Sequence, residues 1–263
     1  AQVAAGRTVR VVTITHVDTS TGVRADVKGL VQTVRAVVPD ALVCIDGVCA
    51  LAAEELRMTD WDVDAYLTGS QKAIGVPPGL SVVVARPRAI AAFEANLAKA
   101  GPGGIRNYYC SWQKWIPIMQ AYEEYRPSYF ATPAVNLINA LHASLNEVLA
   151  DGMDKVFADH KNAADTFRSA MSDLGLKLVP LSEDVAANTM SAVRYPVGVE
   201  ATKLLPAIKK HGAIVAGGLH KDIKAEYFRV GHMGPTVRQA DKAYLNRTIA
   251  AIRSALADCG YSP

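Results

Sequence analysis

Two residues of this chain have the types and positions that chemistry on an aldehyde cofactor needs. Asp46 ends the apolar run 41–46, and Lys72 lies in the polar turn Thr68–Lys72. A lysine amine forms a Schiff base with the aldehyde of pyridoxal 5′-phosphate (PLP), and a carboxylate keeps the pyridine nitrogen of that cofactor protonated, so that the ring accepts electrons. The pair therefore predicts a PLP-dependent enzyme.

Each of the two residues also has a simpler interpretation. A lysine in a loop is usually a solvated charge. An aspartate after a strand is often the N-cap of a following helix, here one that contains Leu51–Leu56. Their joint occurrence at the ends of consecutive strands favours the catalytic interpretation, because ligands bind at the carboxyl ends of the strands in an α/β sheet.

The segments around these residues alternate between strand and helix patterns. Short apolar or alternating runs predict strands, and apolar residues at helical spacing predict a helix between the first two strands. The predicted strands are 9–15, 41–46, 64–70 and 79–86, and the predicted helix is 27–38. This order predicts an α/β fold with a mostly parallel sheet covered by helices.

The rest of the chain mixes helices and strands without strict alternation. The predicted elements are an amphipathic helix at 88–99, an aromatic segment typical of a core or a subunit interface at 108–126, a long helix from Thr132–Pro133 that Asp151–Gly152 interrupts, helices at 153–175, 200–212 and 237–260, and strands at 176–180, 188–196, 214–219 and 227–234. We expect a large cofactor-binding domain with a connecting helix over residues 1–150, and a small α+β domain over 151–263.

The composition argues against several other classes of protein. The formal charge of +3 comes from 28 basic and 25 acidic residues spread along the chain, so no nucleic-acid-binding patch is predicted. No apolar run approaches the ~20 residues of a membrane-spanning helix, and the N-terminus lacks the order of a secretory signal. The four cysteines lack metal-ligand spacing, and no metal site is predicted. We expect an intracellular protein of the cytoplasm or of an organelle such as the peroxisome or mitochondrion.

Five segments together resemble one known family. They are HVDTSTGV (16–23), IDGVCALAAEEL (45–56), MTDWDVDAYLTGSQKAIGVPPGLSVV (58–83), SYFATPAV (128–135) and YFRVGHMG (227–234). In this order they resemble the alanine–glyoxylate and serine–pyruvate aminotransferases, a class V branch of the fold type I PLP enzymes. The resemblance covers the chain from about residue 8 onwards. It implies the large PLP-binding domain of that fold, in part, and a smaller α+β domain.

The resemblance implies a role for each matching residue. Lys72 matches the Schiff-base lysine, whose freed amine moves the proton between the substrate Cα and the cofactor. Asp46 matches the partner of the pyridine nitrogen, and Val48 matches the apolar side chain on one face of the ring. Thr19 stands where the family usually has a serine near the cofactor, and Gln71 matches a phosphate contact.

Three further matches concern the substrate and a second subunit. Tyr129 and Thr132 match residues that reach the cofactor phosphate of the neighbouring subunit, which implies a homodimer. Arg229 matches the arginine that holds the substrate α-carboxylate through a two-pronged hydrogen bond. An arginine within an apolar strand is costly unless it faces an anion. His16 and His232 adjoin these motifs, and we assign neither a catalytic role.

The sequence departs from the family at its N-terminus. The family grips the cofactor phosphate with a glycine-rich turn and covers the outer ring face with an aromatic residue, both upstream of the loop at His16. Only Ala1 to Thr15 precede that loop here. We therefore expect either the C-terminal piece of an enzyme or a chain that works with a separate N-terminal polypeptide. A sheet without its first strands would expose an unpaired edge and apolar surface, so we do not expect this chain to be stable as an isolated monomer.

The reaction implied is PLP-dependent transamination between a small amino acid, alanine or serine, and a 2-oxo acid such as glyoxylate or pyruvate. One alternative is a PLP lyase of the related cysteine desulfurase branch. That chemistry needs a nucleophilic cysteine on a mobile loop, and Cys110 is the cysteine that comes nearest to such a setting. Another alternative is an inactive fragment that serves as a dimerisation or binding module. The presence of Asp46, Lys72 and Arg229 favours the enzyme.

Overall fold

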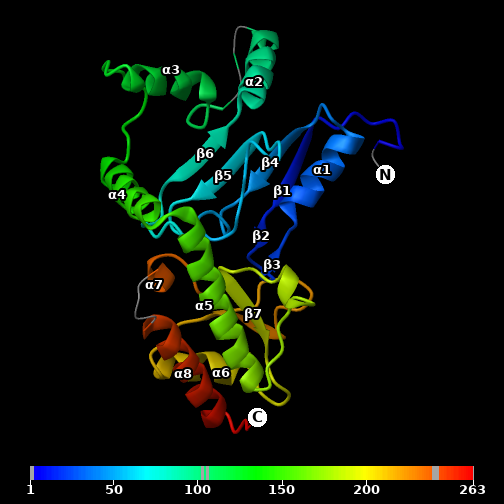
Figure 1. Ribbon diagram of the computed structural model, residues 1–263, viewed down its shortest axis with the longest axis vertical. Helices are drawn as coiled ribbons and strands as arrows, with labels where there is room; N and C mark the ends of the chain where they lie inside the picture. The colour runs from blue at the N-terminus through cyan, green and yellow to red at the C-terminus, as the bar shows by residue number, and fades with distance from the viewer. Residues whose placement is uncertain (1–2, 102–103, 105–106, 239–242, 263) are drawn as a thin grey trace.

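The computed structural model describes residues 3–101, 104, 107–238 and 243–262. A four-stranded sheet occupies the upper half of Figure 1, and a three-stranded sheet with its helices occupies the lower half. The first sheet contains β1 (Val11–Thr15), β4 (Leu42–Asp46), β5 (Ala65–Gly69) and β6 (Ser81–Ala85). The α/β fold predicted from the sequence is confirmed.

The strands of the first sheet lie in the order β1-β4-β5-β6. β1, β4 and β5 are parallel, whereas β6 runs antiparallel to β5. Thr15 pairs with Asp46, and Asp46 pairs with Leu67. This register brings the loops that follow the three parallel strands to the same edge of the sheet.

The helix α1 (Val27–Val37) covers part of this sheet. Its N-cap is Asp26, whose side chain accepts a hydrogen bond of 3.0 Å from the backbone N–H of Gly29. Val27 and Val31, one turn apart, are buried against Val43 of β4 and its neighbours.

A network of ion pairs fixes the helices at the amino end of β5. Asp64 is fully buried and accepts hydrogen bonds from Arg35 of α1 and from two nitrogens of Arg88 in α2 (Pro87–Lys99). Its Oδ2 also accepts the backbone N–H of Val43 at 2.6 Å. One carboxylate therefore ties two helices and a neighbouring strand together.

Both outer strands of the first sheet expose apolar side chains. Val11 of β1 is 50% exposed, and Val83 and Val84 of β6 are 47% and 54% exposed. The next helix, α3 (Trp112–Glu123), projects from the upper end of the molecule in Figure 1. Five tyrosines in and around it are exposed: Tyr108, Tyr109, Tyr122, Tyr125 and Tyr129.

Two long helices connect the sheets. α4 (Val135–Asp151) ends and α5 (Met153–Asp173) begins at Gly152, whose φ of +81° is a conformation that glycine adopts without strain. The interruption predicted at Asp151–Gly152 is confirmed. α5 then runs along the second sheet (Figure 1).

The second sheet is antiparallel in the order β7-β9-β8, with β7 (Met190–Arg194), β8 (Ala216–Gly217) and β9 (Tyr227–Gly231). It packs against α5 and α6 (Ala201–Lys210), and α8 (Ala243–Asp258) packs on these two helices in the same core. Fully buried members of this core are Phe167, Met171, Leu204, Ile208, Phe228 and Ile252. Among the described residues, no helix has the length and apolar character to cross a membrane.

Some predicted elements differ from the structure. The strand predicted at 176–180 is a single bridge between Leu178 and Val193, because the chain bends at residues 179–182 and leaves β7. Of the helix predicted at 237–260, the structure has α8 and a separate four-residue α7 (Pro235–Arg238), and residues 239–242 lie outside the described part.

Three short elements had no sequence-based prediction. β2 (Val17–Asp18) and β3 (Val23–Arg24) form a small hairpin after β1. A 3₁₀-helix, η2, covers Glu183–Val185. These elements are two or three residues long, so they leave no periodic pattern in the sequence.

Candidate active site

The loops that follow β1, β4 and β5 meet at one edge of the first sheet. The backbone N–H of His16 donates to the Asp46 carbonyl at 2.9 Å, and that of Gly47 donates to the Leu67 carbonyl at 2.8 Å. The Thr68 hydroxyl lies 3.3 Å from the carbonyl of Gly47. The three loops therefore form one hydrogen-bonded surface.

Asp46 has one carboxylate oxygen available at this surface. Its Oδ1 accepts the backbone N–H of Val48 at 3.0 Å, and its side chain makes no other hydrogen bond to the described residues. The residues after it, 48–53, form turns rather than an α-helix, so the predicted helix N-cap alternative is wrong. Position 47, directly after Asp46, requires glycine, because a Cβ there would overlap the ring of Tyr66.

Lys72 lies in a turn held by groups from several elements. The Ser70 hydroxyl donates to the Pro77 carbonyl at 2.7 Å, and Ser144 of α4 donates to the Ile74 carbonyl. Gly234 lies beneath the turn, since a Cβ added there would come 3.3 Å from the Lys72 carbonyl. The Lys72 side chain is half-buried, and its ammonium has no partner among the described residues.

Thr19 lies in the loop after β1, and Gln71 lies in the loop after β5. The Thr19 hydroxyl lies 2.8 Å from the Cys49 sulfur, in the turn that follows Asp46. The side chain of Gln71 is exposed and folds over Gly69, where an added Cβ would meet Gln71 Oε1 at 2.7 Å. Val48 is half-buried against a small apolar cluster.

Arg229 reaches the same region from the second sheet. Its Nε donates to the Gly217 carbonyl at 2.8 Å, and its Nη1 donates to the Thr19 carbonyl at 3.2 Å. Because a guanidinium has five N–H groups, three remain without a partner among the described residues. The side chain is thus anchored, and it retains donors for an anion.

Tyr129 and Thr132 do not join this group. Their hydroxyls lie 2.7 Å apart, just before α4, and Tyr129 is 71% exposed. In the described part of the chain, no hydrogen bond links either residue to the other candidate residues. Their assigned role at the phosphate of a neighbouring subunit remains a prediction.

His16 and His232 are buried and neutral. Burial, reinforced by Arg24, lowers the pKa of His16 to about 4. Burial, with Arg168 nearby, lowers the pKa of His232 to about 4 as well. The ring nitrogens of His232 lie 3.2 Å from the Asn188 carbonyl and 2.9 Å from the Ser191 hydroxyl. Both imidazole rings are therefore buried parts of the fold, and we assign neither a catalytic role.

Sequence reasoning missed Tyr227. This residue is fully buried, and its hydroxyl lies among three backbone groups close to those that hold Arg229. The available signal is its spacing, because residues two apart on a strand face the same side of the sheet.

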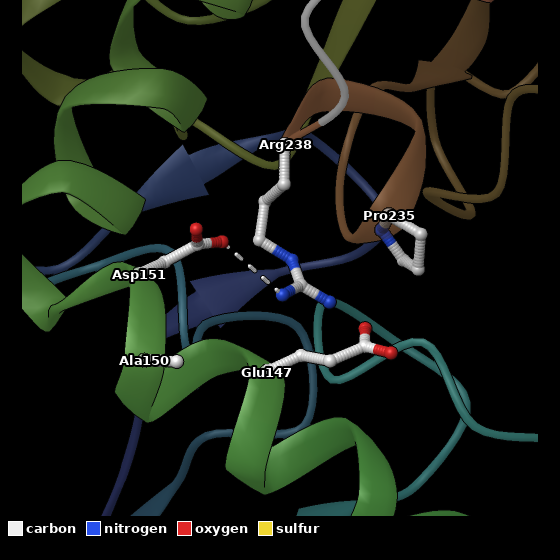
Figure 2. A pocket seen from close by; sticks show the side chains of 5 residues that line it. All are labelled: Glu147, Ala150, Asp151, Pro235 and Arg238. Atoms are coloured by element: carbon white, nitrogen blue, oxygen red, sulfur yellow. Dashed lines mark ion pairs between the residues drawn. The ribbon is translucent and has the colours of Figure 1, made fainter.

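One pocket of the described residues lies away from these loops. It has a volume of about 360 Å³ and is lined by Glu147, Ala150, Asp151, Pro235 and Arg238. Figure 2 shows the Arg238 guanidinium between α4 and α7, with Nη1 3.7 Å from Asp151 Oδ2. None of the candidate residues lines this pocket, and we assign the site to the loop surface instead.

The chain belongs to the class V aminotransferase family. Residues 2–238 match the family model described as "Aminotransferase class-V". The fold agrees: the pyridoxamine–pyruvate aminotransferase of Mesorhizobium loti superposes with a TM-score of 0.82 at 30% identity, over 95% of this chain and 60% of that one.

Two sequence relatives have names that specify a reaction. Alanine–glyoxylate aminotransferase 1 of Saccharomyces cerevisiae is 37% identical over 93% of this chain and 63% of its own length. The L-aspartate–glyoxylate aminotransferase of Paracoccus denitrificans is 34% identical over 87% of this chain and 55% of its own length. This chain therefore spans about 60% of the length of the relatives that it matches.

Proposed function

We propose that this chain is part of a PLP-dependent aminotransferase that moves an amino group between a small amino acid, alanine or serine, and a 2-oxo acid such as glyoxylate or pyruvate. The observation that carries the proposal is the set of unpaired groups on one loop surface: the Lys72 ammonium, one oxygen of Asp46, and three N–H groups of Arg229. The names of the relatives supply the glyoxylate and pyruvate chemistry.

The residues fit PLP by their chemistry. When bound, the cofactor supplies an aldehyde for the amino group and an electron-accepting ring. Lys72 would hold the aldehyde end, and Asp46 would face the pyridine nitrogen with its free oxygen. Val48 would contact one face of the ring, and Thr19 and Gln71 would hold its polar substituents.

Lys72 also acts as the acid–base group in this proposal. With PLP bound, the Lys72 amine would be the group that accepts and donates the proton of the substrate Cα. The half-buried position and the absence of an ion-pair partner among the described residues leave the amine available for this transfer.

Arg229 binds the α-carboxylate of the substrate. Two of its N–H groups are occupied by the Gly217 and Thr19 carbonyls, so the orientation of the guanidinium is set before the substrate arrives. The remaining N–H groups suit a bidentate carboxylate.

The same proposal includes partners. We assign residues 1–150 to the cofactor-binding domain and 151–263 to the small domain. We propose a homodimer in which Tyr129 and Thr132 contact the cofactor phosphate of the partner, supported by the exposed tyrosines around α3. We also propose that an N-terminal portion, in this polypeptide or in a separate one, covers the exposed valines of β1 and β6.

Borohydride reduction of the PLP-loaded protein tests the cofactor assignment. We expect peptide mapping to place the reduced cofactor on Lys72, and Lys72→Ala to abolish the label. Lys28→Ala, a change in an exposed lysine of α1, is the matched control and should label normally. A label on another lysine would refute the assignment.

Half-reactions distinguish the enzyme from its alternatives. In a complete preparation, alanine or serine should convert the PLP absorbance to that of the amine form, and glyoxylate should restore it. With a thiol added as reductant, sulfide release from cysteine that is lost in Cys110→Ser would instead establish the desulfurase branch, since Cys110 is the exposed cysteine of the described residues. PLP binding without any half-reaction would support the inactive module.

A further inference from the structure

A single buried hydroxyl joins two loops beside Arg229. The Tyr227 hydroxyl accepts hydrogen bonds of 2.9 Å from the backbone N–H groups of both Leu219 and His220, and it donates to the Ser20 carbonyl. Tyr227 is fully buried. Without this hydroxyl, two backbone N–H groups and one carbonyl would lose a partner at a part-buried position.

Tyr227 and Arg229 share one face of β9. They are two residues apart, whereas Phe228 between them points into the core of the opposite face. The two side chains therefore extend side by side towards the same pair of loops.

The two loops that Tyr227 ties are the ones that hold Arg229. The carbonyls of Gly217 and Thr19 accept hydrogen bonds from Arg229. Gly217 lies two residues before Leu219, and Thr19 immediately precedes Ser20. Each carbonyl that binds Arg229 thus lies one or two residues along the chain from a backbone group that binds the Tyr227 hydroxyl.

The ring of Tyr227 also fits closely against the first of these loops. A Cβ added to Gly218 would lie 2.8 Å from Tyr227 Cε1 and 2.4 Å from the Lys224 carbonyl oxygen. Glycine therefore lets the backbone pass between the ring and the segment at Lys224, and the loop has little room to shift.

We propose that Tyr227 is a positioning residue for the substrate carboxylate: its hydroxyl fixes the Gly217 and Thr19 carbonyls, which in turn fix the Arg229 guanidinium. The inference rests on the proposed role of Arg229 and deepens it. A planar guanidinium binds a carboxylate through two bonds only in one orientation. A small amino acid offers few other contacts, so its binding depends on that orientation.

Tyr227→Phe in the holoenzyme tests the proposal. We expect KM for alanine or serine to rise about tenfold or more, with kcat changed less than about threefold, because the ground-state and transition-state carboxylates are held alike. An amine without a carboxylate should react with unchanged kcat/KM. In an Arg229→Lys background, Tyr227→Phe should add little further loss, since the two residues act through one contact.

Tyr195→Phe is the matched control. Tyr195 follows β7, its ring packs on Phe228, and its buried hydroxyl has no partner among the described residues. The Tyr195→Phe substitution also removes one tyrosine hydroxyl beside the second sheet. Because that hydroxyl holds neither carbonyl that binds Arg229, KM should be unchanged. Equal losses in both variants, or equal losses for amino acids and amines, would show a general packing defect and overturn the proposal.

Two readouts keep this test separate from the proposed function. The amides of Leu219 and His220 should exchange hydrogen faster in Tyr227→Phe than in the control, and unchanged exchange would overturn the inference. Propionate, a carboxylate without an amine, should bind about tenfold more weakly to Tyr227→Phe. Weaker propionate binding in a protein that never transaminates would retain the inference and refute the proposed function. Unchanged propionate binding to Tyr227→Phe in an enzyme that transaminates would refute the inference and retain the proposed function.

Discussion

Acidification from pH 7 to pH 5 should destabilise this protein strongly, because His16, His160 and His232 are buried and burial lowers the pKa of each. Burial lowers the pKa of His16 and of His232 from 6.5 to about 4. The Nδ1 atom of His16 is buried without a partner in the described residues, so a proton on that nitrogen has no acceptor there. Unfolding exposes these rings and lets them take up protons.

The magnitude follows from the two pKa values. A group whose pKa is lowered on folding contributes its full stability above the unfolded value of 6.5 and loses it as the pH falls towards 4. Integrating the proton uptake between pH 7 and pH 5 gives a loss of about 2 kcal/mol for each histidine. The pair together should remove about 4 kcal/mol, a large share of the ~5–15 kcal/mol stability of a typical domain.

The pH interval separates the histidines from the carboxylates. Hydrogen bonds from Arg88 and others outweigh burial and lower the pKa of Asp64 below 3.8, so the stability it contributes is lost only at lower pH. Burial raises the pKa of Glu54, which gives the opposite slope near its own pKa. Because Glu54 is unchanged in every variant below, its contribution cancels in the comparison.

Urea unfolding at pH 7 and pH 5 measures the effect. The loss between the two pH values should shrink by about 2 kcal/mol in His16→Gln and again in His232→Gln, whatever each change costs at pH 7. His142→Gln, in an exposed histidine of α4, is the control and should keep the full loss. An undiminished loss in both buried-site variants would refute the reasoning.

Three further outcomes are expected. Asp46→Ala should bind PLP but lose at least ~10²-fold in kcat, and near-normal turnover would exclude its role at the pyridine nitrogen. Asp64→Asn should destabilise the fold by roughly 3–5 kcal/mol in urea unfolding, because Arg35 and Arg88 lose their buried partner. Gly218→Ala should lower Tm and raise KM, since its Cβ would overlap Lys224; a neutral Gly218→Ala would contradict the close approach.

Much of the first sheet could be predicted from local patterns. The run 41–46 became β4 at Leu42–Asp46, and the helical spacing at 27–38 became α1 at Val27–Val37. These elements satisfy their backbone through near neighbours or through one uniform ladder, so their apolar periodicity is visible in the sequence. The same rule failed at 176–180, where the chain bends at residues 179–182 and leaves a single bridge to β7.

The candidate site divides in the same way. The residue types and spacing of Asp46 and Lys72 predict the proposed chemistry, because both residues follow parallel strands whose carboxyl ends share an edge of the sheet. The sequence by itself therefore determined the family, the strand ends and the residues that face them.

Only the tertiary structure decided how Arg229 is held. Its two carbonyl partners lie 12 and 210 residues away in the chain, and the Ser20 partner of Tyr227 lies 207 residues away. The acceptors of these hydrogen bonds are backbone carbonyls, which every residue possesses, so no residue type or spacing marks them. They exist because the second sheet packs its β9 face against the loop after β1, and that packing is a property of the folded chain.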